Sequence, residues 1–160
     1  MESRRVGILL WRYVVVSGMS SGGWSSVLDA LETSVCSDPT VEFAVAFGSQ
    51  IEGEPNRSSD LDLAVKFVDD LTDRQRFEKR CFLSGDLQRE DAPFIDLSDI
   101  ETLPLDVAHD AVNGRFVCGD ERAFERFKAD IEATFDEQSD ALRRRQRDVI
   151  DRIAEDGLRG

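Results

Sequence analysis

The chain has 160 residues, of which 41% are hydrophobic and 33% charged, and its formal net charge is −13. This length and composition fit one globular domain with a real core and exclude a disordered protein or two independent domains. The acidic balance argues against direct binding of nucleic acid, which needs clustered cations to meet the phosphates.

Residues 1–18 stand apart from the rest of the chain. The apolar runs Val6–Leu10 and Val14–Val16 are interrupted by an arginine and are too short to span a bilayer, so we expect no association with a membrane. Three interpretations stay open for this segment. It is an added strand, a leader upstream of a start at Met19, or an export signal, for which Ser3-Arg4-Arg5 is a loose twin-arginine match.

The cysteines and the single histidine give little sign of chemistry. Cys36, Cys81 and Cys118 are odd in number, widely spaced and without a C-x-x-C pair. This pattern predicts buried free thiols and neither a disulfide framework nor a zinc site. His109 is the only histidine, which makes His-paired nucleophilic catalysis improbable and predicts a residue on a helix surface.

The first half of the chain predicts one helix and two strands. Apolar residues at helical spacing predict a helix over 24–35, and Asp38-Pro39 ends it. Residues 41–47 are nearly continuously apolar, with β-branched and aromatic side chains, which predicts a buried strand. Residues 59–67 form the second predicted strand.

The middle of the chain predicts a helix, a strand and another helix. A helix over 70–88 is expected to bury one face, made of Leu71, Phe77, Cys81, Phe82 and Leu87. Residues 93–97 predict a short third strand. Pro104 suits the first turn of a helix that runs to Asn113. This alternation of helices and strands indicates an α/β or α+β fold.

A short strand at 115–118 and a long helical region complete the pattern. Asp120 caps this region, which has no glycine or proline before Gly157, and a break is expected near Ser139. Its arginine run, Arg143 to Arg147, is interpreted as a solvated helix face, with binding of an acidic partner or of RNA as the alternative. Apolar residues line one face of each half: Phe124, Phe127, Ile131 and Phe135, then Leu142, Val149, Ile150 and Ile153.

One motif carries most of the chemistry: Gly48-Ser49, ten residues, then Asp60-Leu61-Asp62. Alternate side chains of a strand share a face, so Asp60 and Asp62 project together, about 7 Å apart. Such carboxylates bind hard cations, and a Gly-Ser turn that opens a helix offers N–H groups and a hydroxyl to phosphate. The motif predicts a site for a metal-bound nucleoside triphosphate, with a solvated acidic edge and a plain turn as alternatives.

This motif, with Gly53 and the later Phe94-Ile95-Asp96-Leu97, resembles that of the nucleotidyltransferase fold shared with the catalytic domain of DNA polymerase beta. The resemblance is strongest to the minimal, MNT-type members and covers roughly residues 24–135. It implies an α/β (α+β) fold in which helices flank a small mixed sheet, with a long C-terminal helical region. The domains expected from it are an N-terminal extension at 1–18, a nucleotidyltransferase domain at 19–136 and a helical tail at 137–160.

The resemblance also implies a role for each residue of the motif. Gly48 and Ser49 would hold the triphosphate of ATP. Asp60 and Asp62 would bind two Mg²⁺ ions, with Asp96 on the neighbouring strand as a third metal ligand or as general base. The reaction would transfer a nucleoside monophosphate and release pyrophosphate.

Stand-alone proteins of this type resemble antitoxins that are paired with a HEPN-domain ribonuclease toxin. The resemblance implies that the chain transfers AMP from ATP to a hydroxyl of that toxin, on a tyrosine, and so neutralises it in the cytoplasm. A chain of 160 residues leaves no room for an acceptor-binding domain, so the acceptor is either small or presented by another protein. Two alternatives stay open: a binding-only antitoxin on the same fold, and a small-molecule nucleotidyltransferase of the aminoglycoside type.

Overall fold

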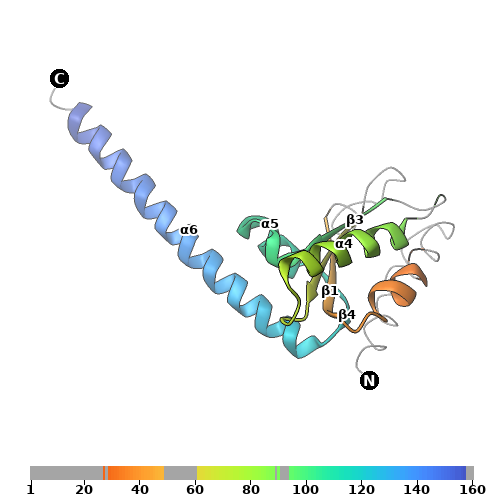
Figure 1. Ribbon diagram of the computed structural model, residues 1–160. Coiled ribbons are helices and arrows are strands. Elements are labelled where there is room, and N and C mark those ends of the chain that lie inside the picture. The colour runs from red at the N-terminus through yellow and green to blue at the C-terminus, as the bar shows by residue number, and fades with distance from the viewer. Residues whose placement is uncertain (1–26, 28, 49–60, 89, 91–93, 158–160) are drawn as a thin grey trace.

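The computed structural model describes residue 27 and residues 29–48, 61–88, 90 and 94–157. The predicted strands and helices are present in the expected order (Figure 1). In chain order the elements are η1 (Leu31–Val35), β1 (Val41–Phe47), β2 (Leu61–Phe67), α4 (Asp73–Leu87), β3 (Ile95–Asp99), η2 (Ile100–Thr102), α5 (Leu105–Val112), β4 (Arg115–Gly119) and α6 (Glu121–Gly157).

The four strands form one mixed sheet in the order β3-β2-β1-β4. Strand β1 is antiparallel to both β2 and β4, whereas β2 and β3 are parallel. Parallel neighbours need a crossover between them, and α4 lies in that connection. The arrangement confirms the expected small mixed sheet flanked by helices.

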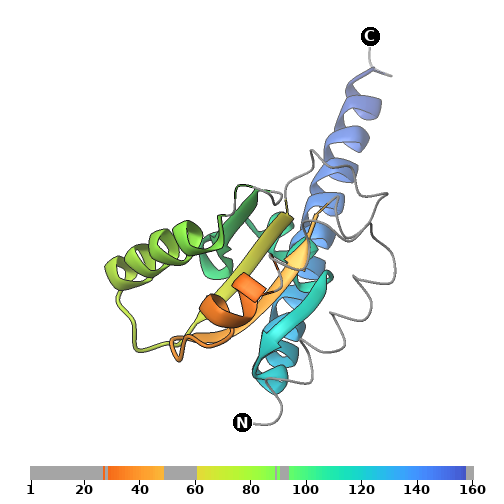
Figure 2. The ribbon, with the colours of Figure 1, turned by 90° about the vertical axis from the view of Figure 1, so that its right-hand side faces the viewer.

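Each face of the sheet packs against a different pair of helices. Leu61, Leu63 and Val65 of β2 point to the face covered by η1 and α4, as their alternation with polar residues predicts. Ala64 points to the opposite face, which α5 and α6 cover. Phe124 of α6 belongs to the same buried cluster as Ala64. Figure 2 shows η1 in front of the strands and α6 behind them. The sheet is therefore the middle layer of the molecule.

The inward face of α4 differs from the one that its sequence predicts. Phe77, Cys81 and Phe82 are exposed, and the buried residues of α4 are Leu83 and Leu87. The helix begins at a capping box, in which Thr72 and Gln75 each bond the other's backbone N–H. The reason for the different face lies in the ion pairs of α4.

Two cations tie α4, η2 and the sheet together at the end of β2 farther from Asp62. Lys66 Nζ lies 2.9 Å from Glu42 Oε2 of β1, and Arg76 Nη1 of α4 lies 2.6 Å from Glu101 Oε2 of η2. Burial alone would lower the pKa of Lys66, but its hydrogen bonds to Glu42 and Asp69 outweigh burial and raise it. The side of α4 that carries Arg76 therefore faces the sheet.

Helix α6 is continuous over 37 residues, so the expected break near Ser139 is wrong. The predicted face of its first half is confirmed, since Phe124 and Phe127 pack on the ring of Phe43. His109 lies on α5, as predicted; it is half-buried there and stacks on Phe135 with ring centroids 3.9 Å apart. None of the helices in the described ranges combines the length and apolar character needed to cross a bilayer.

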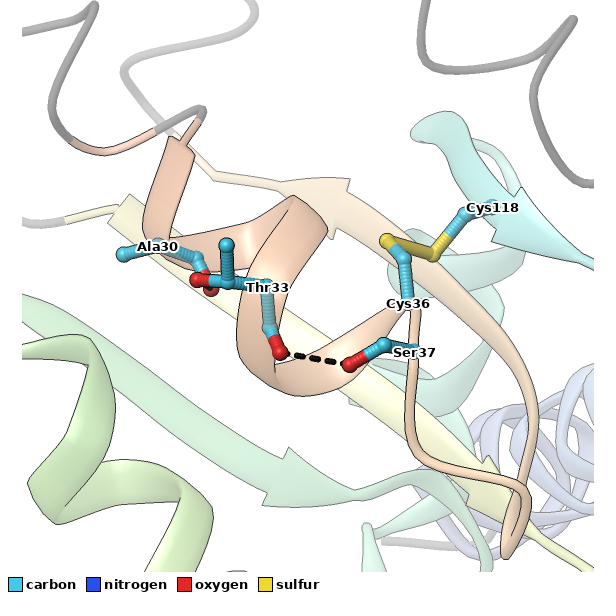
Figure 3. Close-up of a disulfide and its surroundings, with 5 residues drawn as sticks. All are labelled: Ala30, Thr33, Cys36, Ser37 and Cys118. Atoms are coloured by element: carbon cyan, nitrogen blue, oxygen red, sulfur yellow. Dashed lines mark hydrogen bonds between the residues drawn. A yellow bond between two sulfur atoms is a disulfide. The ribbon is translucent and has the colours of Figure 1, made fainter.

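Cys36 and Cys118 form a disulfide, which corrects the prediction of buried free thiols (Figure 3). The bond joins the residue after η1 to β4, with Cα atoms 5.9 Å apart and a separation of 82 positions in the sequence. Sequence spacing gave no sign of this pair because folding alone brings η1 against β4. Cys81 is a free and exposed thiol.

Asp38 links the turn before β1 to α4, and this link predicts a pH-dependent loss of stability. Burial alone would raise the pKa of Asp38, but hydrogen bonds from Lys79 and Thr40 outweigh burial and lower it. Because the folded pKa lies below the unfolded one, the carboxylate stabilises the fold above about pH 4, and this contribution is lost as pH falls through the folded pKa. Thermal unfolding of Asp38→Asn at pH 7 should show a loss of about 1 kcal/mol. The two chains should converge near pH 2, and an equal difference at both pH values would contradict this account.

Candidate active site

The structure brings two of the predicted site carboxylates together at one end of the sheet. Asp62 is the second residue of β2, and Asp96 is the second residue of β3. The two are direct partners in the parallel pairing of these strands. Side chains at paired positions project from the same face, with backbones about 4.8 Å apart. Residues that are 34 apart in sequence therefore present their carboxylates side by side.

Burial on the far side of the strands holds these carboxylates in place. The residues that flank Asp62 and Asp96 point into the core under η1 and α4, where Leu61, Leu63 and Ile95 are fully buried. A one-residue slip of either strand would expose those apolar side chains and bury the carboxylates, so the register is strongly fixed. Asp62 is half-buried and Asp96 is exposed, which leaves this carboxylate pair open to a substrate.

Gly48 follows β1 directly and packs against Asp62. Phe47, the last residue of β1, is paired with Asp62, and Gly48 has φ +93°, a conformation that favours glycine. A Cβ atom placed on Gly48 would overlap the Oδ2 atom of Asp62. The glycine thus brings the backbone of the turn against the carboxylate, at the place where the motif predicts a phosphate beside a metal ligand.

Replacing Gly48 with alanine should therefore damage the site more than the fold. The new methyl group would meet Asp62 Oδ2 in a backbone conformation that L-residues rarely adopt. We expect Gly48→Ala to lose about 1–2 kcal/mol of stability in thermal unfolding. The nucleotidyl transfer that the resemblance of the motif implies should fall on the order of 100-fold because Asp62 must move aside.

The matched control is Gly85→Ala in α4, where an added Cβ has open space within 4 Å. This variant should keep full activity and gain slightly in stability, because alanine is the better helix former. Equal activity of the two variants would show that the approach of Gly48 to Asp62 has no part in the reaction.

Gly114 lies close to the end of β1 beside the site, and the sequence analysis assigned it no role there. It stands just before β4, and a Cβ there would overlap the backbone oxygen of Ala46 and crowd Phe47. The absence of a side chain lets the turn before β4 pack against the last residues of β1. The glycine itself was the available signal, although it also suited the end of α5.

Two predicted site residues, Ser49 and Asp60, lie outside the described residues. Within the described ranges, no three His, Cys, Asp or Glu side chains form a group that could hold a metal ion. The donor chemistry of Asp62 and Asp96 nevertheless fits Mg²⁺, which prefers carboxylate oxygens and usually takes only one or two from a protein. In the sequence, Asp60 stands two positions before Asp62.

Solved structures with the same fold are toxin–antitoxin complexes. A toxin–antitoxin complex with AMP-PNP contains a chain that is 21% identical, with a TM-score of 0.56, over 79% of this chain and 97% of that one. The Shewanella oneidensis complex of a tri-AMPylated HEPN toxin with an MNT antitoxin matches at 18% identity and a TM-score of 0.55, over 79% and 98%. An MntA–HepT complex matches at 20% identity and a TM-score of 0.51, over 79% and 95%.

The family comparison covers the sheet and its site. Comparison with curated protein sequences gives no match. The family described as polymerase beta, nucleotidyltransferase, matches residues 31–123, more than half of the chain, from η1 through β4 to the start of α6. This range contains the Gly48-Ser49 turn and all three predicted carboxylates. The chain belongs to the polymerase beta nucleotidyltransferase family.

Proposed function

We propose that the chain is an antitoxin that transfers AMP from ATP to a tyrosine hydroxyl of a HEPN-domain ribonuclease toxin and thereby neutralises it. The observation that carries the proposal is the in-register pair Asp62–Asp96, with Gly48 packed against Asp62. Membership of a nucleotidyltransferase family supports the reaction class. The AMPylated HEPN toxin in one structural relative, and the AMP-PNP in another, support the nucleotide and the acceptor.

In the proposed reaction, the acceptor oxygen forms a bond to the α-phosphorus of ATP, and the bond from that phosphorus to the β-phosphate oxygen breaks. Pyrophosphate leaves with the electron pair of that bond. In this proposal the backbone at Gly48 and the hydroxyl of Ser49 orient the triphosphate, and Asp96 acts as a third metal ligand or as the general base that accepts the acceptor's proton. Mg²⁺ held by Asp60, Asp62 and Asp96 would neutralise phosphate charge and lower the pKa of the acceptor hydroxyl when bound.

The test is incubation with labelled ATP, magnesium and the helical protein encoded beside this chain. Label should appear on that protein with the natural chain, and vanish with Asp60→Ala/Asp62→Ala. Asp70→Ala, an exposed aspartate in the turn before α4, is the matched control and should keep full transfer. We place the reaction in the cytoplasm, where ATP is plentiful.

The same experiment separates the two alternatives. Neutralisation of the toxin that survives Asp60→Ala/Asp62→Ala without any label would indicate a binding-only antitoxin. Label that appears on an aminoglycoside-type alcohol, and not on the neighbouring protein, would indicate a small-molecule nucleotidyltransferase. Either outcome would overturn the proposal.

A further inference from the structure

The last part of α6 extends from the body of the molecule with an exposed apolar stripe. Figure 1 shows α6 running outward to the C-terminal end. Every residue from 140 to 157 is exposed, and an isolated helix of this length is marginal in water. Four large apolar side chains nevertheless stand in solvent, with these exposed fractions: Leu142 57%, Val149 50%, Ile150 63% and Ile153 67%.

These apolar residues lie along one face of α6. At 3.6 residues per turn, Leu142, Val149 and Ile153 lie in a row along α6, with Ile150 beside them. The row continues towards the body into a hollow of about 590 Å³, lined by Leu105 of α5 and by Phe135 and Leu142 of α6, among others. The stripe therefore ends at a recess that an apolar side chain of another molecule can fill.

Positive charge predominates beside this stripe, although the chain as a whole is acidic. Arg145 and Arg152 flank the row on one side, together with Asp156, and Arg143 flanks it on the other, while Asp151 and Glu155 lie on the opposite side of the helix. Residues 143–152 hold five arginines and two aspartates, a net charge of +3 within a chain of −13. The exposed face thus combines an apolar centre with an arginine rim.

We infer that this face of α6 docks into an apolar groove of the partner protein whose rim carries carboxylates. The inference rests on the proposed function for the existence of a partner protein. An amphipathic helix laid in a groove is a common recognition mode, with anchors spaced as Leu142, Val149 and Ile153 are. Opposite charge at the rim would speed association and select the partner.

The charges beside the apolar row disfavour a second copy of this chain as the molecule that covers this face of α6. In an antiparallel pair of α6 helices, the flank with Arg145, Arg152 and Asp156 would meet the same flank of the other copy, so that each side brings two arginines and only one aspartate. In a parallel pair, the run from Arg143 to Arg147 would meet its own counterpart. A membrane surface or RNA fits less well, because residues 136–157 hold seven carboxylates against five arginines.

The test measures binding of the helical protein encoded beside this chain, by titration calorimetry. Leu142→Glu/Ile153→Glu and Arg145→Glu/Arg152→Glu should each weaken binding about 100-fold. Arg144→Glu is the matched control, since it lies on the opposite side of the helix, and it should change binding less than about threefold. Circular dichroism should show unchanged helix content in each variant. If Leu142→Glu/Ile153→Glu unfolds, the binding measured with Arg145→Glu/Arg152→Glu still tests the docking face.

Transfer kinetics then separate this inference from the proposed function. The rim variant should raise KM for the partner and leave kcat unchanged, because the reacting groups lie on β2 and β3. Equal binding by all variants overturns the inference and leaves the proposed function standing. Binding that depends on this face, without label on the partner, supports the docking face and overturns the transfer. A natural chain that binds no partner, or whose α6 binds a single-stranded RNA or vesicles of phosphatidylcholine and phosphatidylglycerol instead, overturns the inference.

Discussion

Replacing Asp62 with asparagine should lower kcat for adenylyl transfer on the order of 1,000-fold. Asparagine keeps the size of the side chain but removes the negative charge that would hold a divalent cation beside Gly48 and opposite Asp96. Transfer of labelled AMP to the partner protein, followed over time at saturating ATP, measures the effect. Binding of the partner should stay within about threefold of the natural value, because we place docking on α6.

The same substitution at an aspartate outside the site serves as the control for this prediction. Asp70→Asn replaces an exposed aspartate in the turn between β2 and α4, beyond the end of β2 farther from Asp62, and should keep full transfer. Circular dichroism should show the same fold for both variants. A loss of less than tenfold in Asp62→Asn would remove Asp62 from the reaction and leave the Asp62–Asp96 pair without a catalytic role.

Reduction of the Cys36–Cys118 disulfide should give the largest change in stability. The bond closes a loop of 82 residues, and the loss of such a cross-link costs about 2–4 kcal/mol, chiefly by freeing the unfolded chain. For a domain of this size the midpoint of thermal unfolding should fall by roughly 10 °C in dithiothreitol. The reaction is proposed for the cytoplasm, where thiols are kept reduced, so the reduced chain is the form to compare with the proposed activity.

Two cysteine variants test the origin of that shift. Cys36→Ala should unfold at the lower temperature with or without dithiothreitol, since it cannot form the bond. Cys81→Ser keeps the bond and should respond to dithiothreitol as the natural chain does. If dithiothreitol leaves the midpoint of thermal unfolding of the natural chain unchanged, the bond adds no stability.

Local pattern was enough to predict the strands and part of the site. The strand over 41–47 agrees with β1, because its apolar run fits a strand buried on both faces. The alternation around Asp62 and Asp96 correctly predicted that both would point away from the neighbouring apolar residues. The pairing of these aspartates across parallel strands depends on tertiary structure and cannot be read from local pattern. The sequence analysis included it only through the family resemblance.

The inward face of α4 could not be predicted from hydrophobicity because ion pairs occupy half of it. Arg76, Lys79, Leu83 and Leu87 lie on one side of this helix at intervals of three and four residues. The first two meet carboxylates of η2 and of the turn before β1, and only the last two are apolar. Phe77 and Phe82, which look like core residues in the sequence, therefore stay outside.

The disulfide also sets how the chain responds to a single cut by a protease. Gly48, Asp62 and Asp96 all lie inside the segment that Cys36 and Cys118 bracket, whereas α6 lies outside it. One cut anywhere between these cysteines leaves both fragments covalently joined while the bond is oxidised, so a nicked chain can keep its site assembled. One cut in the exposed length of α6 frees that end at once, and with it the surface assigned to the partner.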